Sequence, residues 1–128
     1  MATILFVYGT LKRGQLRHDL LAGAEFLGEA RTLPHYHLFD LRAYPGLVPA
    51  IDDGTAVEGE LWRVDEAKLR RLDEYEGALF RRERVSLASV SEPVDCYFYT
   101  GSLGDARDCG AFWPPGETKG SGLGQDWY

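Results

Sequence analysis

The sequence has few cysteines, no strongly basic stretch and no long hydrophobic run, and each shortage excludes a class of protein. Two cysteines, Cys96 and Cys109, cannot form the disulfide framework of a small secreted domain. A net charge of -6 and a pI of about 5.0 argue against binding to the phosphates of nucleic acid. The N-terminal apolar run has no charged segment before it and is too short to span a membrane. We therefore expect a cytoplasmic protein with reduced thiols that binds neither nucleic acid nor a membrane.

The chain does contain enough apolar residues for a folded core. Of its 128 residues, 45% are hydrophobic and 12% are aromatic, which argues against disorder. This length predicts one domain over residues 1–128, in an oligomeric state that the sequence leaves open. Residues 101–128 are rich in glycine, and we interpret them as a C-terminal tail or a covering loop. Their aromatic residues, Trp113, Trp127 and Tyr128, would cover the mouth of the fold or form a partner surface.

The opening stretch has the pattern of a strand, a loop between two glycines, and a helix. Residues 3–8 are rich in β-branched and aromatic side chains, as in a buried strand. Gly9 and Gly14 bracket the loop, and leucines recur at helical spacing over residues 14–22. Glycine permits a sharp turn, and free N–H groups before a helix can face an anion. The loop is therefore a candidate anion-binding site, although two ordinary turn glycines would give the same pattern.

The rest of the chain alternates short strand patterns with loops and a second helix. Strands are predicted over residues 26–33, 35–39, 57–64, 81–90 and 94–100, and loops over residues 44–49 and 52–54. The last two strands form a hairpin across Ser91-Glu92-Pro93. Asp65 is an N-cap for the second helix, and Gly77 ends that helix. Together these elements indicate an α+β fold, with a small curled or barrel-like sheet and helices packed outside it.

The second helix ends in a cluster of carboxylates, Asp73, Glu74 and Glu76, where the helix dipole makes negative charge unfavourable. One interpretation, which the residue types alone favour, is a solvated acidic cluster that pairs with basic residues one turn earlier. The other is that one carboxylate lies there for function, because neighbouring acids and partial burial would raise its pKa. A carboxyl group with a raised pKa can transfer protons near neutral pH. Glu76 is the acid nearest to the turn at Gly77.

For three other features a structural interpretation is favoured over a functional one. His35 and His37 would share one face of a strand, but no third metal ligand is evident nearby. Tyr97 is expected to pack in the core, with a hydroxyl facing a pocket as the alternative. Tyr44 and Pro45 have the composition of an ordinary turn.

Five short motifs follow one another over residues 4–100. They are Tyr8-Gly9-Thr10-Leu11 with Gly14, Tyr44-Pro45-Gly46, Gly59-Glu60-Leu61, Leu72-Asp73-Glu74-Tyr75-Glu76-Gly77, and a strand from Arg82 to Val85. In order and spacing they resemble the γ-glutamylcyclotransferase-like superfamily, and within it the γ-glutamylamine cyclotransferase and AIG2-like proteins. This resemblance implies a small mixed β-barrel with flanking helices. It also implies a substrate-binding loop made of Tyr8, Gly9, Thr10 and Leu11, and one catalytic glutamate, Glu76.

The resemblance further implies a metal-independent enzyme, without an organic cofactor, that converts a small γ-glutamyl amide to 5-oxoproline and a free amine. Attack of the α-amine on the γ-carbonyl is intramolecular, and such attack reaches effective molarities of roughly 10⁵ M or more. Backbone N–H groups of residues 9–11 would hold the α-carboxylate. Glu76 would take a proton from the α-amine and return it to the leaving group. Two alternatives remain, a non-catalytic binding module with the same pocket and removal of a γ-glutamyl group from a larger biosynthetic amine.

Overall fold

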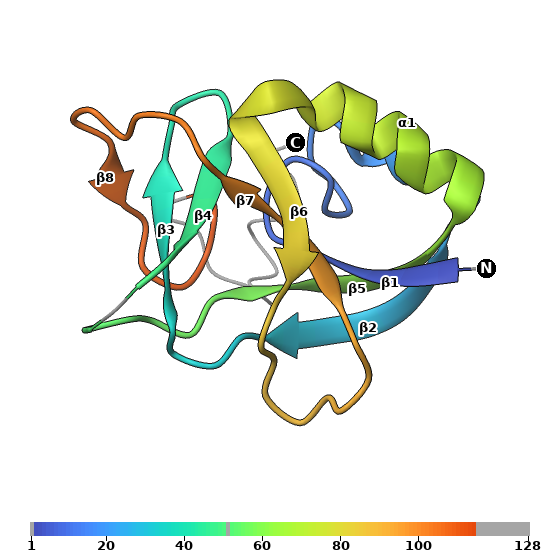
Figure 1. The fold of residues 1–128 in the computed structure, drawn as a ribbon, viewed down its shortest axis with the longest axis horizontal. Coiled ribbons are helices and arrows are strands. Elements are labelled where there is room, and N and C mark those ends of the chain that lie inside the picture. The colour runs from blue at the N-terminus through green and yellow to red at the C-terminus, as the bar shows by residue number, and fades with distance from the viewer. Residues whose placement is uncertain (1, 51, 115–128) are drawn as a thin grey trace.

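The computed structural model describes residues 2–50 and 52–114, which form one curled sheet with a single α-helix packed on it (Figure 1). The strands are β1 (Ala2–Val7), β2 (Glu25–Arg31), β3 (Tyr36–Asp40), β4 (Pro45–Pro49), β5 (Glu58–Asp65), β6 (Phe80–Arg84), β7 (Asp95–Tyr99) and β8 (Arg107–Asp108). The α-helix is α1 (Glu66–Glu76), and two short 3-10 helices are η1 (His18–Leu21) and η2 (Gly77–Leu79). The α+β class and the small mixed sheet that the sequence predicts are confirmed.

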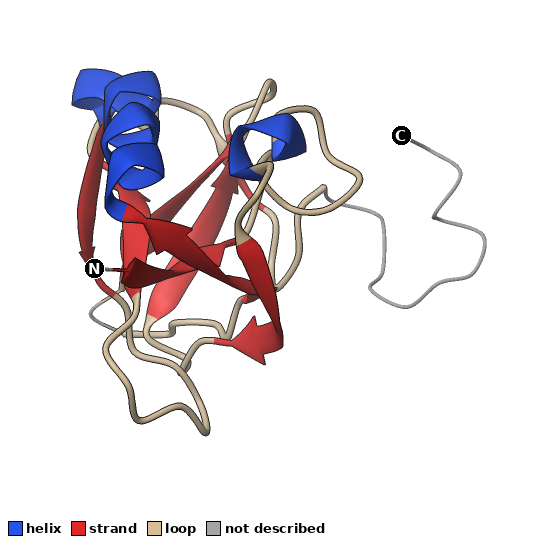
Figure 2. Cartoon of the chain, turned by 90° about the vertical axis from the view of Figure 1, so that its right-hand side faces the viewer, coloured by secondary structure: helices blue, strands red, loops and turns tan. Residues whose placement is uncertain are grey.

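The sheet divides at β7, which pairs with three other strands. One edge of β7 pairs with β6 in the antiparallel sense along its whole length. The other edge is shared, because Cys96 pairs with Phe6 of β1 and Phe98 pairs with Leu47 of β4, both in the parallel sense. From there β5 and β2 continue beyond β1, while β3 and β8 continue beyond β4. The strands therefore curve around a common interior instead of forming a flat layer (Figure 2).

Both faces of β1 are buried. Phe6 lies in the apolar cluster that the curled sheet encloses. Leu5 lies on the opposite face, in a second cluster with Leu72 of α1. Strand β5 is covered in the same way, with Leu61 in the first cluster and Trp62 in the second. This explains why the sequence of β5 does not separate polar from apolar residues by alternation.

Helix α1 begins and ends where the sequence predicts. The side chain of Asp65 accepts a hydrogen bond from the N–H of Lys68 at 2.7 Å, which satisfies an open donor at the N-terminus. Gly77 follows the helix with φ of 69°, in the left-handed region that ends many helices. The chain then continues as η2. Glu76 is thus fixed as the last residue of α1.

The prediction of a helix over residues 14–22 is wrong. The N–H of Arg17 donates to the carbonyl of Thr10 at 2.8 Å, so the chain makes successive turns, and only η1 is helical in this stretch. Leu16 is 74% exposed while Leu21 is 1% exposed, so the leucine spacing does not mark one helical face. Turn bonds that reach back to the loop replace the i to i−4 bonds of an α-helix.

The prediction of a loop over residues 44–49 is also wrong, because these residues contain β4. Pro45 and Pro49 are the first and last residues of this strand, where a missing N–H is tolerated. The hairpin between β6 and β7 is confirmed, but it is shorter than expected. Strand β6 ends at Arg84 and β7 begins at Asp95, so residues 85–94 form a long connection.

Residues 101–113 pack against the sheet. Strand β8 pairs with β3, and the N–H of Glu58 donates to the carbonyl of Ala111 at 2.8 Å. Trp113 is 8% exposed and belongs to the cluster that the sheet encloses. Trp127 and Tyr128, for which the sequence suggests a covering role, lie outside the described residues. Within residues 2–50 and 52–114, no helix has the length and apolar character needed to cross a membrane.

Candidate active site

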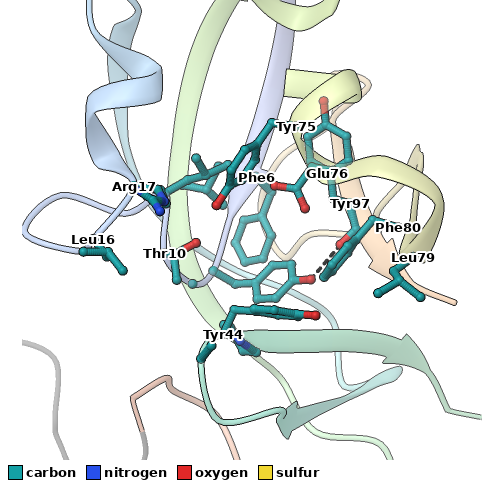
Figure 3. Close-up of a pocket in the computed structure, with 16 residues that line it drawn as sticks. Phe6, Thr10, Leu16, Arg17, Tyr44, Tyr75, Glu76, Leu79, Phe80 and Tyr97 are labelled. Carbon is teal, nitrogen blue, oxygen red and sulfur yellow. Dashed lines mark hydrogen bonds between the residues drawn. The ribbon is translucent and has the colours of Figure 1, made fainter. Parts of the chain in front are cut away.

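A cavity of about 340 Å³ lies beside the C-terminal end of β1 (Figure 3). Its lining comes from residues 6–11, Leu16 and Arg17, the turn of residues 43–45, the C-terminal end of α1 with η2 and Phe80, and Tyr97 of β7. Segments that are far apart in the chain therefore meet around one space. A cavity of this size suits a small molecule.

The cavity brings together all the site residues that the sequence predicts. Tyr8, Gly9, Thr10 and Leu11 line it from the loop after β1, and Glu76 lines it from the end of α1. In Figure 3 the carboxylate of Glu76 points into the cavity, with Thr10 on the other side. Glu76 is half-buried and makes no hydrogen bond or ion pair with another described residue. The catalytic role of Glu76 and the binding role of the loop stay predictions.

The loop after β1 turns sharply and leaves backbone donors open. The N–H of Lys12 donates to the carbonyl of Gly9 at 3.0 Å, which closes a turn. A Cβ atom on Gly9 would lie 2.6 Å from Cδ of Pro45, so the space admits only glycine. The N–H groups of Gly9, Thr10 and Leu11 donate to no other described residue. All three residues line the cavity, so their N–H groups are candidate donors to an anion there.

The side chain of Tyr8 links two strands while it lines the cavity. Its hydroxyl donates to the carbonyl of Tyr97 in β7 at 2.7 Å and accepts from the N–H of Leu47 in β4 at 3.1 Å. The hydroxyl thus joins β7 to β4 at the place where the sheet divides. Burial raises the pKa of Tyr8 well above its usual value, so the hydroxyl stays protonated.

The surroundings of Glu76 favour its neutral form. Burial, followed by the nearby charge of Asp73, raises the pKa of Glu76 to about 7. Asp73 itself stays ionised, because a hydrogen bond from Arg82 holds the pKa of this carboxyl below its usual value. The raised pKa that the sequence suggests for one acid of this cluster is therefore present on Glu76, with burial as its main cause. Such a group changes protonation state near neutral pH.

Asp73 belongs to a network that the sequence analysis missed. Its Oδ1 accepts from Nε of Arg82 at 2.8 Å and from the hydroxyl of Tyr97 at 2.6 Å. Nη1 of Arg82 in turn donates to Oδ2 of Asp95 at 2.6 Å. Tyr97, expected in the core, thus also lines the cavity and has its hydroxyl engaged by Asp73. Charged residues in both strands of the predicted hairpin were the available signal for this network.

Two buried charged residues hold the loop from outside the cavity. Glu60 in β5 is 8% exposed and accepts from the backbone N–H of Arg13 at 3.0 Å and from its Nε at 3.1 Å. Lys12 is 4% exposed, and its Nζ donates to the carbonyl of Trp113 at 2.6 Å. The sequence offers only a short motif around Glu60 and no signal for the contact of Lys12. Because of these bonds, the loop is held in place without a ligand.

The histidine pair and the turn before β4 differ in their relation to the cavity. Tyr44, expected to be only a turn residue, lines the cavity, whereas His35 and His37 do not. Nδ1 of His37 lies 3.1 Å from Oδ2 of Asp108. In the described part of the chain, no three His, Cys, Asp or Glu side chains come together as a set of metal ligands.

Comparisons with known proteins relate this chain to two named relatives. A Vibrio cholerae protein named putative gamma-glutamylcyclotransferase is 37% identical over 112 residues, which cover 86% of this chain and 95% of that protein. The gamma-glutamylaminecyclotransferase of Bos taurus is 40% identical over 107 residues, which cover 75% of this chain and 64% of that protein. The chain thus spans nearly all of the bacterial relative and somewhat under two thirds of the bovine one.

A solved structure and a family model agree with the names of these two relatives. The crystal structure of a protein specific to uropathogenic Escherichia coli matches with a TM-score of 0.77 at 29% identity, covering 84% of this chain and 87% of that one. The family model described as Gamma-glutamyl cyclotransferase, AIG2-like matches residues 5–114, which include Glu76 and the loop after β1. With this match over most of its length, the chain belongs to the gamma-glutamyl cyclotransferase, AIG2-like family.

Proposed function

We propose that the protein is an enzyme of the γ-glutamylamine cyclotransferase type, which converts a small γ-glutamyl amide to 5-oxoproline and a free amine. The main support is the single cavity that Glu76 shares with the loop of residues 8–11. The name of the bovine relative supports the choice of an amide of a free amine as substrate. A cavity of about 340 Å³ has room for the γ-glutamyl part of such a substrate.

In this proposal, the two charged groups on the α-carbon of the γ-glutamyl group bind to different parts of the cavity. The α-carboxylate accepts hydrogen bonds from the open N–H groups of Gly9, Thr10 and Leu11. The α-ammonium group lies toward the carboxylate of Glu76. With the α-carbon fixed by both groups, only the short side chain has to fold back for the γ-carbonyl to approach the amine, which removes much of the entropic cost of ring closure.

Glu76 is suited to move the proton. Because the pKa of Glu76 is about 7 and not about 4.5, accepting a proton from the α-ammonium group costs ~3 kcal/mol less than it would with an ordinary carboxyl group. The freed amine then attacks the γ-carbon, the new ring C–N bond forms, and the C–N bond to the leaving group breaks. Glu76 returns its proton to the departing amine, and its carboxylate then takes the second proton from the ring nitrogen and passes it to the released amine, which leaves as an ammonium ion. No water is consumed.

The developing oxyanion needs a donor that is still free. The hydroxyl of Tyr8 already donates to the carbonyl of Tyr97, and the hydroxyl of Tyr97 already donates to Asp73. Since the loop N–H groups hold the α-carboxylate, we assign oxyanion stabilisation to the hydroxyl of Thr10, which lines the cavity and donates to no other described residue.

The experiment is to measure 5-oxoproline and amine released from a panel of γ-glutamyl amides by the wild type and by Glu76→Gln. The substitution keeps the shape of the side chain and removes proton transfer, so kcat/KM should fall by about 10²–10⁴-fold. Glu74→Gln is the matched control, because Glu74 is exposed, lies on the same helix and does not line the cavity. This variant should keep the wild-type rate.

Other results would point to the alternatives. Full activity of Glu76→Gln would remove Glu76 from its role. Tight binding of a γ-glutamyl ligand without turnover of any amide would identify a binding module instead of an enzyme. Turnover confined to a bulky biosynthetic amide would favour removal of a γ-glutamyl group from a larger amine.

A further inference from the structure

The side chain of His18 holds the loop after β1 from outside the cavity. Nδ1 of His18 lies 2.9 Å from the carbonyl oxygen of Leu11. Because a carbonyl oxygen only accepts hydrogen bonds, this nitrogen carries the hydrogen and donates it. Leu11 lines the cavity, whereas His18 is half-buried and does not. The bond therefore joins a loop that the proposed substrate touches to a side chain that this substrate does not reach.

The bond from His18 begins a series of hydrogen bonds that runs through the loop. The peptide group between Leu11 and Lys12 accepts from His18 at its carbonyl. Its N–H, on Lys12, donates to the carbonyl of Gly9 at 3.0 Å. The peptide group between Gly9 and Thr10 ends in the N–H of Thr10, which donates to no other described residue. Since the C=O and N–H of a trans peptide point in opposite directions, this N–H points away from Lys12.

This series gives His18 an influence on a donor at the cavity. Each bond fixes the direction of the next peptide group and polarises it. Thr10 lines the cavity, and its N–H is one of the donors that the proposed function assigns to the α-carboxylate. If the carbonyl of Leu11 turned, the N–H of Lys12 would turn with it and release the carbonyl of Gly9. The N–H of Thr10 would then lose its fixed direction.

The ring of His18 is itself held by buried neighbours. The ring centroids of His18 and Trp62 are 5.1 Å apart, and Trp62 is 7% exposed. Nε1 of Trp62 donates to Oε1 of Glu60 at 3.1 Å, and the same oxygen accepts from the N–H of Arg13 at 3.0 Å. The ring is thus packed against a residue that is bonded in the same support as the loop.

We propose that His18 is a positioning residue for binding of the α-carboxylate, because its Nδ1–H fixes the N–H of Thr10 through the bonded peptide groups of the loop. This inference rests on the proposed function for the identity of the bound carboxylate. In this role His18 moves no proton and does not touch the substrate. The competing explanation is that His18 only packs against Trp62, and the two explanations differ in which part of the side chain matters.

Two variants separate the donor from the ring. His18→Phe keeps an aromatic ring beside Trp62 and removes the donor. His18→Asn removes the ring and keeps an N–H on a nitrogen that is as many bonds from Cα as Nδ1 of histidine. The readouts are kcat and KM with the best γ-glutamyl amide of the panel, Kd for 5-oxoproline by calorimetry, and urea unfolding. 5-Oxoproline is the probe because it retains the carboxylate.

The α-carboxylate does not react, so its hydrogen bonds persist from bound substrate to product. Loss of one such bond raises KM and leaves kcat nearly unchanged. For His18→Phe we expect KM and the Kd of 5-oxoproline to rise by about fivefold or more, with kcat within about twofold of the wild type. His18→Asn should bind 5-oxoproline more tightly than His18→Phe and yet unfold at a lower urea concentration. A role in packing alone would not give these opposite orders.

His35→Phe is the matched control, since His35 is exposed and does not line the cavity. It should keep the wild-type KM and Kd. Wild-type values of KM and Kd in His18→Phe, or binding by His18→Asn no tighter than by His18→Phe, would overturn the inference and leave the proposed function standing. Absence of turnover by the wild type would count against the proposed function, and the Kd series would still decide the role of His18. Failure of the wild type to bind 5-oxoproline would overturn the inference.

Discussion

Three carboxylates lie close together at the end of α1, and each has different surroundings. Glu74 is exposed, Asp73 is bonded to Arg82 and Tyr97, and Glu76 is half-buried with no bond to another described residue. The sequence located the cluster and pointed to Glu76 by its nearness to Gly77. It could not predict the difference in burial, because that depends on which strands pack against the helix.

The pH dependence of activity follows from the raised pKa of Glu76. Glu76 must be ionised to accept a proton, so kcat/KM should rise with pH through about 7. In Asp73→Asn the neighbouring negative charge is lost, the pKa of Glu76 falls, and the rise should move to lower pH. Rates measured from about pH 5 to about pH 9 would check this, with Glu74→Gln as the control that does not move. A rise at the same or a higher pH in Asp73→Asn would contradict the prediction.

Stability should change with pH in the opposite sense to activity. The pKa of Glu76 is about 7 in the folded state and near its usual value of about 4.5 when unfolded, so ionisation of this group destabilises the fold. Its stabilising contribution is complete below the unfolded pKa and is lost as pH rises through about 7. Glu76→Gln cannot ionise, so near pH 9 it should be more stable than the wild type by roughly 1–3 kcal/mol.

Urea unfolding of both proteins at about pH 4 and about pH 9 would measure this difference. The two proteins should be alike at the lower pH, where Glu76 is neutral. Equal stability at the higher pH, or a less stable variant there, would show that burial does not disfavour the carboxylate.

Local signals in the sequence predicted some elements and not others. The strands β1 and β5 and the caps of α1 were predictable, because strand propensity and capping by Asp65 act within a few residues. Strand β4 was not, because Pro45 and Gly46 have the composition of a turn. The pairing of β4 with β3, and the complete burial of Leu47, override that local preference. The expected helix over residues 14–22 was wrong for a similar reason. The N–H of Arg17 bonds the carbonyl of Thr10 in the preceding loop, and only the short helix η1 forms.

The division of the sheet at β7 gives the hydroxyl of Tyr8 a structural role that can be measured. Tyr8→Phe would leave the carbonyl of Tyr97 and the N–H of Leu47 without this partner, so the free energy of unfolding should fall by ~1–3 kcal/mol. Because neither bond involves a ligand, kcat/KM should change by less than about tenfold.

Tyr99→Phe is a matched control for urea unfolding, since among the described residues the hydroxyl of Tyr99 bonds only the exposed carbonyl of Ser102. Its stability should stay within about 0.5 kcal/mol of the wild type. A large loss of activity in Tyr8→Phe at unchanged stability would instead place the Tyr8 hydroxyl on the substrate.

At the scale of the whole molecule, residues 101–113 contact the loop that follows β1. Lys12 and Trp113 are 101 positions apart in sequence, yet Nζ of Lys12 donates to the carbonyl of Trp113. The resemblance seen in the sequence stopped at residue 100, so nothing in it assigned a role to Trp113. The glycine-rich composition around Trp113 also gives no periodic pattern, and only tertiary contacts show that this residue completes the core.

Trp113→Ala should therefore destabilise the entire fold. Removal of a large buried aromatic side chain leaves a cavity in the enclosed cluster, and such changes cost about 3–5 kcal/mol. Urea unfolding would measure the loss. Asp105→Ala, an exposed change in the same segment, should stay within about 0.5 kcal/mol of the wild type. A Trp113→Ala protein as stable as that control would show that the segment only rests on the surface.

The contact of Lys12 with Trp113 also sets an order of events during translation. The ribosome makes residues 8–14 before Trp113, whose carbonyl supports the loop and is added 101 positions after Lys12. A nascent chain that stops before this point has the loop but lacks one of the bonds that hold it. The loop that lines the cavity therefore gains this bond only after most of the described fold has been synthesised.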